Sequence, residues 1–243
     1  MRFGLEQIGP QDVFTVTMTT ILLAAAIAFP NASADYRAAL DALAGAKTVS
    51  FKVRAGIYHV ALPEDPVFSP VFVGEMLLAR DGRWRWKQPD GKVMLFDGKD
   101  VWACVEGLWW KEDLEAVALN RSPITRGGLE QYILGMDIFL SGKWRGVKGR
   151  TDWVYLSQSK EDERITVARP NSPEKLGALL RDHGLADGVF LEFDSKTLAP
   201  VVGYWYSSNS YDREEGWTEY SEFRFNPSDA EELLKPGTPS ATR

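Results

Sequence analysis

The stretch of sequence that decides the fold is GEMLLARDGRWRWKQPDGKVMLFDGKDVW, residues 74–102. It consists of short apolar segments separated by Asp-Gly pairs at 81–82, 90–91 and 97–98. Asp-Gly between two apolar segments favours a tight hairpin turn, because glycine adopts a positive φ at no steric cost. Turns repeated at intervals of about eight residues predict an antiparallel meander rather than βαβ units.

Similar segments on both sides of this stretch extend the predicted sheet. The predicted strands are 49–54, 71–80, 83–87, 93–96, 101–105, 151–157, 164–168, 189–193, 201–206 and 217–225. Residues 49–54 alternate apolar and polar side chains, which is typical of a strand with one solvated face. Helices are predicted at 35–46, 122–136 and 172–183, and the last two begin with Ser-Pro, a common helix start.

Several of these strands are apolar on both faces, notably those at 93–96, 101–105 and 201–206. Three helices cannot cover both faces of so many strands. A sheet that curls into a trough buries one face around its own interior. The pattern leaves two interpretations open, which are an ordinary core filled by side chains and an apolar cavity.

The first 34 residues are predicted to be a signal peptide that lies outside the fold. Residues 21–29 form an uncharged apolar run, and Ala32-Ser33-Ala34 supplies the small residues that a signal peptidase accepts. The run is shorter than the ~20 residues that a membrane span needs. We therefore expect export, cleavage after Ala34, a single domain over 35–234 and a flexible tail over 235–243, with Met18 as an alternative start.

Composition argues against several classes of function. The 243 residues include 28 basic and 34 acidic side chains, a net charge of −6, so no nucleic-acid partner is expected. One cysteine excludes a disulfide framework and a thiolate zinc site, and two histidines exclude most imidazole-based metal sites, so no cofactor is expected. The lone Cys104 is expected to be a small buried residue. Because no nucleophile elbow, phosphate loop or His-Glu-x-x-His motif occurs, no catalytic residue is predicted and the chain is not expected to be an enzyme.

The order of residues within 74–102 resembles that of the LolA family of periplasmic lipoprotein carriers. The shared features are a glycine-led strand closed by an arginine, an aromatic-x-Trp strand that ends near a proline, and an apolar segment followed by Asp-Gly-Lys, two residues and Trp. The chain departs from the family pattern in two places. Asp81 stands where the family has a proline, and the predicted helix at 172–183 is an addition.

The resemblance implies a strongly curved, incompletely closed antiparallel β-barrel, with helices forming a lid over an apolar cavity. It also implies a monomeric periplasmic carrier for the acyl chains of lipoproteins. Such a carrier takes its cargo from an inner-membrane ABC-type lipoprotein release complex and delivers it to an outer-membrane acceptor lipoprotein. The alternative is a periplasmic sensor or regulatory module on the same fold, and an uncharacterised hydrolase is a third hypothesis.

Residue by residue, Trp84 and Trp86 fall on the family's aromatic pair that faces the cavity, and Arg80 falls on the arginine that latches the lid through backbone carbonyls. A cavity roofed by the 122–136 helix gives the full set of predicted lipid-binding residues, which is Phe51, Val53, Met76, Leu78, Trp84, Trp86, Leu95, Trp102, Ile133 and Met136.

The direction of Arg80 depends on the length of the loop that follows it. A two-residue loop at 81–82 pairs Arg80 with Arg83 and points its side chain outward. A three-residue loop pairs it with Trp84 and points it toward the lid. We expect the inward direction, because an arginine at the rim can satisfy carbonyls at the C-terminal end of a lid helix.

Overall fold

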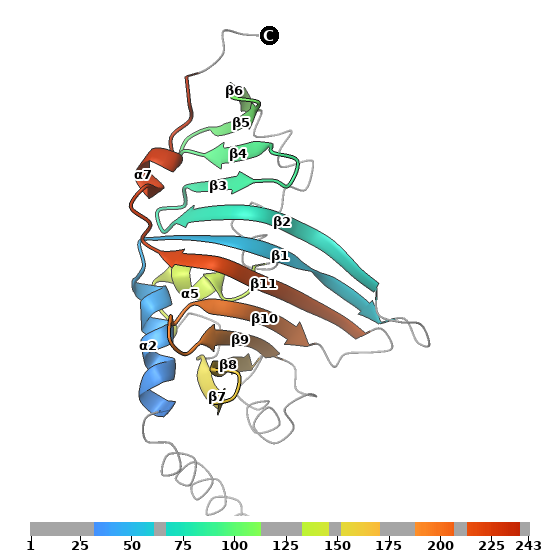
Figure 1. Ribbon diagram of the computed structural model, residues 1–243, viewed down its shortest axis with the longest axis vertical. Helices are drawn as coiled ribbons and strands as arrows, with labels where there is room; N and C mark the ends of the chain where they lie inside the picture. The colour runs from blue at the N-terminus through green and yellow to red at the C-terminus, as the bar shows by residue number, and fades with distance from the viewer. Residues whose placement is uncertain are drawn as a thin grey trace, which may run out of the picture.

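The computed structural model of the chain describes residues 32–60, 67–112, 133–145, 152–170, 188–206 and 213–238. These residues form one antiparallel sheet and a few helices (Figure 1). The strands are β1 (Thr48–Val60), β2 (Val67–Ala79), β3 (Trp84–Lys87), β4 (Val93–Phe96), β5 (Val101–Val105), β6 (Leu108–Glu112), β7 (Val154–Ser159), β8 (Arg164–Pro170), β9 (Gly188–Asp194), β10 (Pro200–Tyr206) and β11 (Arg213–Phe225).

The eleven strands lie in the order β6-β5-β4-β3-β2-β1-β11-β10-β9-β8-β7. β6 and β7 form the two edges and do not pair with each other, so the sheet does not close. The long strands β1, β2 and β11 bend across the middle of the sheet (Figure 1). This architecture confirms the incompletely closed antiparallel barrel that the sequence predicts.

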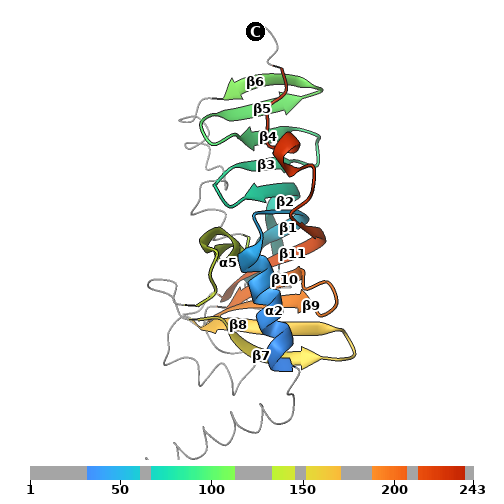
Figure 2. The ribbon, with the colours of Figure 1, turned by 90° about the vertical axis from the view of Figure 1, so that its left-hand side faces the viewer.

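Within the described residues, three helices accompany the sheet, α2 (Ala32–Gly45), α5 (Met136–Ser141) and α7 (Ala230–Leu233). α2 confirms the helix predicted at 35–46, and it contacts α5, β7 and β8. Figure 2 shows α2 and α7 on the same side of the molecule, each crossing the ends of strands. The predicted helix at 172–183 lies outside the described residues, as do residues 122–132 of the predicted helix at 122–136.

The described end of the helix predicted at 122–136 differs from the prediction. Residues 133–135 form a turn, and α5 begins at Met136, where the predicted helix was to end. The physical reason lies at Gly135, whose φ of 84° is left-handed and therefore interrupts a right-handed helix. Two short elements were not predicted at all, the edge strand β6 and the helix α7.

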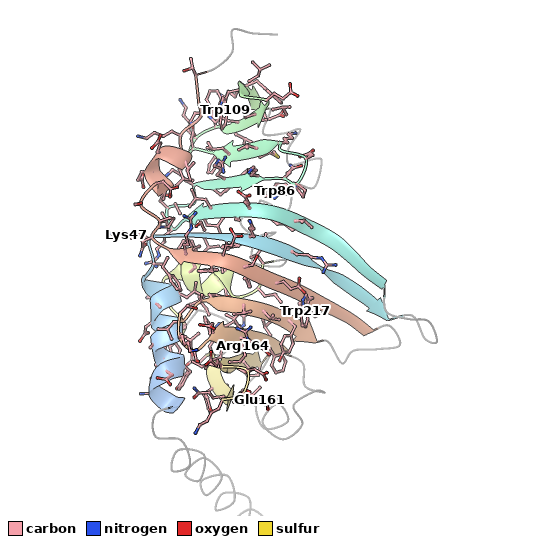
Figure 3. The ribbon with its side chains drawn as sticks, viewed as in Figure 1. Lys47, Trp86, Trp109, Glu161, Arg164 and Trp217 are labelled. Atoms are coloured by element: carbon pink, nitrogen blue, oxygen red, sulfur yellow. The ribbon has the colours of Figure 1, made fainter. Side chains whose placement is uncertain are left out.

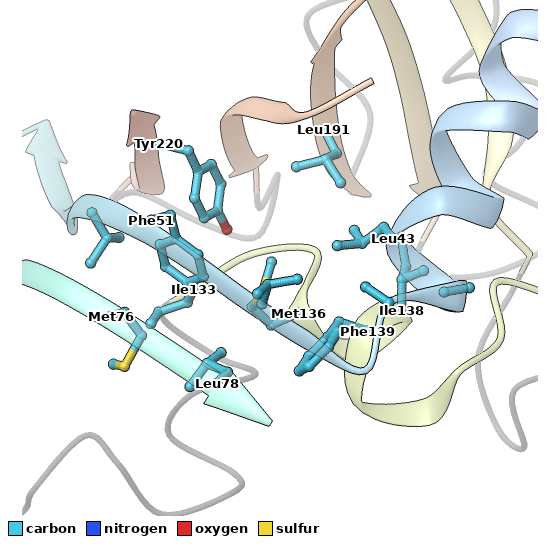
Figure 4. Packing of buried hydrophobic residues seen from close by; sticks show 14 of the residues in the cluster. Leu43, Phe51, Met76, Leu78, Ile133, Met136, Ile138, Phe139, Leu191 and Tyr220 are labelled. Carbon is cyan, nitrogen blue, oxygen red and sulfur yellow. The ribbon is translucent and has the colours of Figure 1, made fainter. Parts of the chain in front are cut away.

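The register of the strands separates the side chains of the sheet into two faces. Phe51, Met76, Trp86 and Met94 are consecutive partners across β1, β2, β3 and β4 and therefore share one face. We call this the inner face, because its side chains form one apolar cluster with those of α2 and α5 (Figure 4). The opposite side of the sheet, the outer face, carries α7, which packs on Leu77 and Ala79.

Candidate functional site

The candidate site is the inner face. Seven of the ten predicted lipid-binding residues belong to its buried cluster, and Trp86 packs against the cluster from its rim. These eight are Phe51, Val53, Met76, Leu78, Trp84, Trp86, Ile133 and Met136. They come from β1, β2, β3 and the segment that leads into α5, so the fold brings together residues that are up to 85 positions apart, from Phe51 to Met136.

The structure does not bring Leu95 and Trp102 to this face. They are partners in the β4–β5 ladder, and Leu95 also pairs with Arg85, so all three point to the outer face. Side chains alternate along a strand, and the neighbours of Leu95, Met94 and Phe96, already point inward. The sequence could not show this, because all four residues of β4 are apolar.

The outer position of Trp102 also explains the spacing between Asp97 and Trp102. One carboxylate oxygen of Asp97 accepts hydrogen bonds from the backbone N–H groups of Lys99 and Asp100, both at 2.8 Å. The other oxygen accepts one from Trp102 Nε1 at 2.8 Å. The aspartate therefore fixes the turn and the tryptophan together, and Trp102 has a structural contact of its own.

Arg80 links the sheet to the lid helices. Its Nη2 donates hydrogen bonds to the carbonyl oxygens of Ala44 and Ala46, at the C-terminal end of α2. Its guanidinium also lies 5.7 Å from the centre of the Phe139 ring of α5. The Arg80 side chain thus points toward the lid helices, and its role as a latch stays a prediction.

The loop that carries Arg80 differs from both predicted registers. Ala79 N donates to Arg83 O at 2.9 Å, and Leu78 pairs with Trp84. The loop consequently consists of Arg80, Asp81 and Gly82, and Arg80 has neither Arg83 nor Trp84 as its strand partner. Since its backbone N–H donates to Lys47 O at 2.9 Å instead, the side chain is turned toward the end of α2.

Further polar contacts fasten α5 to the sheet, and sequence analysis missed them. Asp137 forms an ion pair with Arg169 of β8, and the two side chains are only 8% and 16% exposed. The hydroxyl of Tyr220 in β11 donates to the carbonyl of Leu134, and burial raises the pKa of this tyrosine well above its ordinary value. The signal that could have revealed the first contact is a lone aspartate inside the apolar run 133–140.

Around these contacts the inner face is packed with side chains. Ile133, Met136, Ile138 and Phe139 of the α5 segment are all fully buried. They meet the sheet at β1, β2 and β9, with α2 alongside (Figure 4). We call the strands β7–β10 with the helices α2 and α5 the lidded end of the molecule.

At the β5–β6 hairpin the inner face becomes exposed to solvent. Val105 pairs with Leu108, and Trp110 with Ala103, so these apolar side chains share the inner face. Val105, Leu108 and Trp110 are 41%, 50% and 39% exposed. We call the β5–β6 hairpin the exposed end, and Figure 3 shows Trp109 at this end of the molecule.

The outer side of β6 meets the first residues of the expected C-terminal tail. Lys235 N donates to Glu232 O at 3.2 Å, and Gly237 lies so close to Trp109 that a Cβ there would be 2.4 Å from Nε1 of the indole. Residues 235–238 therefore lie along the sheet, and residues 239–243 are outside the described part of the chain.

Within the described residues, no group of three or more His, Cys, Asp or Glu side chains is placed to hold a metal ion. No helix in that part of the chain is long and apolar enough to cross a membrane. Cys104 is buried on β5, as predicted from the sequence.

No protein-family model and no curated protein matches the chain. Among solved structures it is similar to the lipoprotein LppX of Mycobacterium tuberculosis, at 12% identity, with 82% of this chain and 97% of that chain covered and a TM-score of 0.35. It is also similar to a DUF1329 family protein from Desulfovibrio piger, at 12% identity, 84% and 96% coverage and a TM-score of 0.28.

A LolA superfamily protein from Nitrosomonas europaea is a further similar structure, at 13% identity, 79% and 93% coverage and a TM-score of 0.27. All three TM-scores are low, so the class of the protein rests on its own strand order and on the helices that pack on its inner face. That class is a half-barrel with a helical lid. An incompletely closed barrel of this kind is also what the resemblance of residues 74–102 to the LolA family implies.

Proposed function

We propose that the protein is an exported carrier that holds the acyl chains of lipoproteins against its inner face and ferries them from the inner to the outer membrane. The observation that carries this proposal is the inner face itself. It is apolar from the lidded end, where Leu191 and Phe193 are fully buried, to the exposed end, where Leu108 and Trp110 meet solvent. An acyl chain is recognised by apolar area of this kind rather than by charge.

On this proposal, α5 occupies the place of the cargo in the empty protein. Its residues Met136 and Phe139 cover the inner face, so an acyl chain would displace them and take over their apolar contacts. Burying an acyl chain contributes about 0.8 kcal/mol per methylene, which exceeds about 10 kcal/mol for a long chain that is fully buried.

The contacts that hold the lid oppose cargo binding. A hydrogen bond to a charged group contributes about 1.5–3 kcal/mol, and Arg80 donates two of them to the end of α2. Opening the lid therefore costs part of what acyl burial supplies. The free energy that remains after lid opening gives a moderate affinity for the acyl chain, which suits a carrier that must also release its cargo.

The proposed route begins in the periplasm, after removal of the signal peptide at Ala34. An inner-membrane ABC-type release complex would hand over the acylated lipoprotein, and an outer-membrane acceptor lipoprotein would receive it. Closure of the lid after handover would prevent the cargo from returning. The apolar side chains of the exposed end would be the first to meet an acyl chain.

The test is an exchange assay with a triacylated lipoprotein. We expect the protein to extract the lipoprotein from inner-membrane vesicles and to pass it to an acceptor. Arg80→Leu should still bind the lipoprotein but transfer it about tenfold more slowly, because each 1.4 kcal/mol lost from lid closure is a factor of ten.

The matched control is Arg164→Leu, since Arg164 forms only a loose pair with Asp194 at 3.9 Å and points to the outer face of β8, on the side opposite to α5. It should transfer cargo at the normal rate. Absence of any acyl binding by the unmodified protein would refute the carrier. A stable complex with one partner protein, without exchange of cargo, would favour the sensor instead.

A further inference from the structure

A hollow lies on the outer face, on the side of the sheet opposite to the proposed acyl site. It has a volume of about 170 Å³ and lies beside α7, whose Leu233 forms one wall. The register places Arg224, Ser50, Leu77 and Arg85 in one row across β11, β1, β2 and β3. Lys52, Glu75 and Glu222 also line the hollow, and its lining is completed by Phe51 and Met76, whose side chains belong to the inner cluster.

Both carboxylates at the hollow already have cationic partners. Lys52 Nζ lies 2.5 Å from Glu222 Oε1, and Lys87 Nζ lies 3.3 Å from Glu75 Oε1. These two ion pairs neutralise the carboxylates. They leave the charges of Arg85 and Arg224 as the excess at this site.

Arg85 and Arg224 have no carboxylate within 4.0 Å anywhere in the part of the chain that the structure describes. The contrast with Arg83 on the same side of the molecule is direct, because Arg83 bonds both Asp81 and Glu231 at 2.8–2.9 Å. Burial lowers the pKa of Arg85, and the nearby charge of Glu75 offsets only part of this effect. Such a charge is costly to keep in an empty protein, and an anion would compensate it.

Ser50 adds a third donor to the hollow. Its hydroxyl oxygen accepts a hydrogen bond from Arg224 Nε at 3.1 Å, and its side chain is buried against the sheet. A hydroxyl has one hydrogen to donate in addition to its acceptor sites. With Nε of Arg224 occupied in this way, the two terminal nitrogens of that guanidinium and the Ser50 hydrogen can turn to the same ligand.

We propose that this hollow binds a phosphate-type oxyanion, either free phosphate or the phosphodiester of a lipid headgroup, between Arg85, Arg224 and the Ser50 hydroxyl. Guanidinium groups match phosphate oxygens in pairs of parallel hydrogen bonds, which makes arginine well suited to this ligand. The strands that separate the two arginines are spaced at about 4.8 Å, so two long arginine side chains can reach one anion over Leu77. The site does not depend on the proposed function, because it uses the opposite face of the sheet.

The experiment is a calorimetric titration of the full protein with inorganic phosphate in chloride buffer. We expect saturable 1:1 binding, and a rise in the melting temperature with phosphate concentration, because a ligand that binds only the folded state stabilises it. Arg224→Gln and Arg85→Gln should each weaken binding at least about tenfold, as expected for loss of one charge-assisted contact. The control is Arg54→Gln on the same face, which should bind phosphate like the unmodified protein.

Sedimentation with vesicles separates the two sources of the ligand. Phosphate binding together with binding to phosphatidylglycerol vesicles, but not to phosphatidylcholine vesicles, would assign a lipid headgroup. Phosphate binding without vesicle binding would assign the free anion. If the unmodified protein binds neither, or if Arg224→Gln binds both as well as the unmodified protein does, the proposal is wrong. Arg224 is exposed, so this variant tests the site without endangering the fold.

Discussion

The two ends of the inner face share one sequence pattern but differ in what covers them. At the lidded end, Ile165, Val167, Leu191 and Phe193 are completely buried under α2 and α5. At the exposed end, Leu108 and Trp110 follow the same alternation and face solvent. The difference teaches that alternation determines which side chains share a face, whereas the placement of the helices determines which part of that face is dry.

The largest effect is expected from the ion pair that holds the lidded end together. Arg169→Met leaves Asp137 buried without its cationic partner, so the free energy of unfolding should fall by about 3–5 kcal/mol. Urea unfolding followed by tryptophan fluorescence measures this change. Methionine keeps most of the apolar contact that Arg169 makes with Trp153, whose ring lies 5.1 Å from the guanidinium carbon.

Two further variants show whether the loss comes from the buried charge. The double variant Asp137→Leu/Arg169→Met should recover much of the stability, because it removes both charges at once. Lys196→Met breaks the exposed pair with Glu163 and should cost less than about 1 kcal/mol. Equal losses for Lys196→Met and Arg169→Met would show that lid burial does not strengthen the Asp137 pair.

Leucine truncations compare the two ends of the inner face directly. Leu191→Ala should cost about 2–5 kcal/mol, because the side chain is fully buried and its removal leaves a cavity. Leu108→Ala should change stability by less than about 0.5 kcal/mol, since half of that residue is exposed. Chemical denaturation of both variants under one set of conditions gives the comparison, and similar losses would contradict the division into two ends.

Gly74 lies between the two ends, where Trp86 packs over β2. Its φ is +146°, and a Cβ there would come within 2.3 Å of Lys87 O and 2.7 Å of Trp86 Nε1. Gly74→Ala should therefore destabilise the protein by about 1–3 kcal/mol and displace Trp86, which stacks on Phe72 at 4.3 Å. Near-ultraviolet circular dichroism reports the displacement.

The control for Gly74 is Gly45→Ala at the end of α2. Nothing lies within 4 Å of a Cβ at Gly45, so this change should leave stability within about 1 kcal/mol of the original or improve it slightly. An unchanged near-ultraviolet spectrum for Gly74→Ala would mean that the position of Trp86 does not depend on the absence of a side chain at Gly74.

The smallest effect concerns α7 on the outer face. Hydrogen bonds from Arg83 lower the pKa values of Glu231 and Asp81. A carboxyl group whose folded-state pKa is lowered contributes stability above its unfolded pKa of about 4, and that contribution is lost as the pH falls through the folded pKa. Arg83→Gln should lower the melting temperature slightly at pH 7. The difference from the unmodified protein should shrink toward pH 3, and a difference that is constant with pH would contradict the assignment.

Much of the fold could be predicted because its signals are local. The Asp-Gly pairs give β3, β4 and β5 nearly residue for residue, and the apolar spacing of 35–46 gives α2. β6 was missed because Glu106-Gly107, which forms its turn with φ values of 51° and 82°, is a less familiar hairpin dipeptide than Asp-Gly. The predicted strands at 49–54 and 217–225 are too short, because β1 and β11 support each other far beyond their own alternating stretches.

The face of the sheet to which a site residue points could be predicted only where its neighbours along the strand are polar. Trp84 and Trp86 alternate with charged residues, so their common face is plain from the sequence. Leu95 stands in a strand without polar residues, and its face is set by the register with β3. The pair between Asp137 and Arg169 joins residues 32 positions apart, and nothing local to either one specifies the other.

The order of the strands also has a consequence for how the chain folds. Among the described strands, every ladder joins sequence neighbours except the one between β1 and β11, where Lys52 meets Glu222 across 170 positions. Non-local pairing of this kind slows folding, because the entropy cost of closing the long loop comes before the stabilising contacts between the two strands can form. We expect β1–β6 and β7–β11 to form early as separate arrays of hairpins, with their joining at β1–β11 as the slow step. A chain cut between β6 and β7 would then yield two fragments that reassemble through that single ladder.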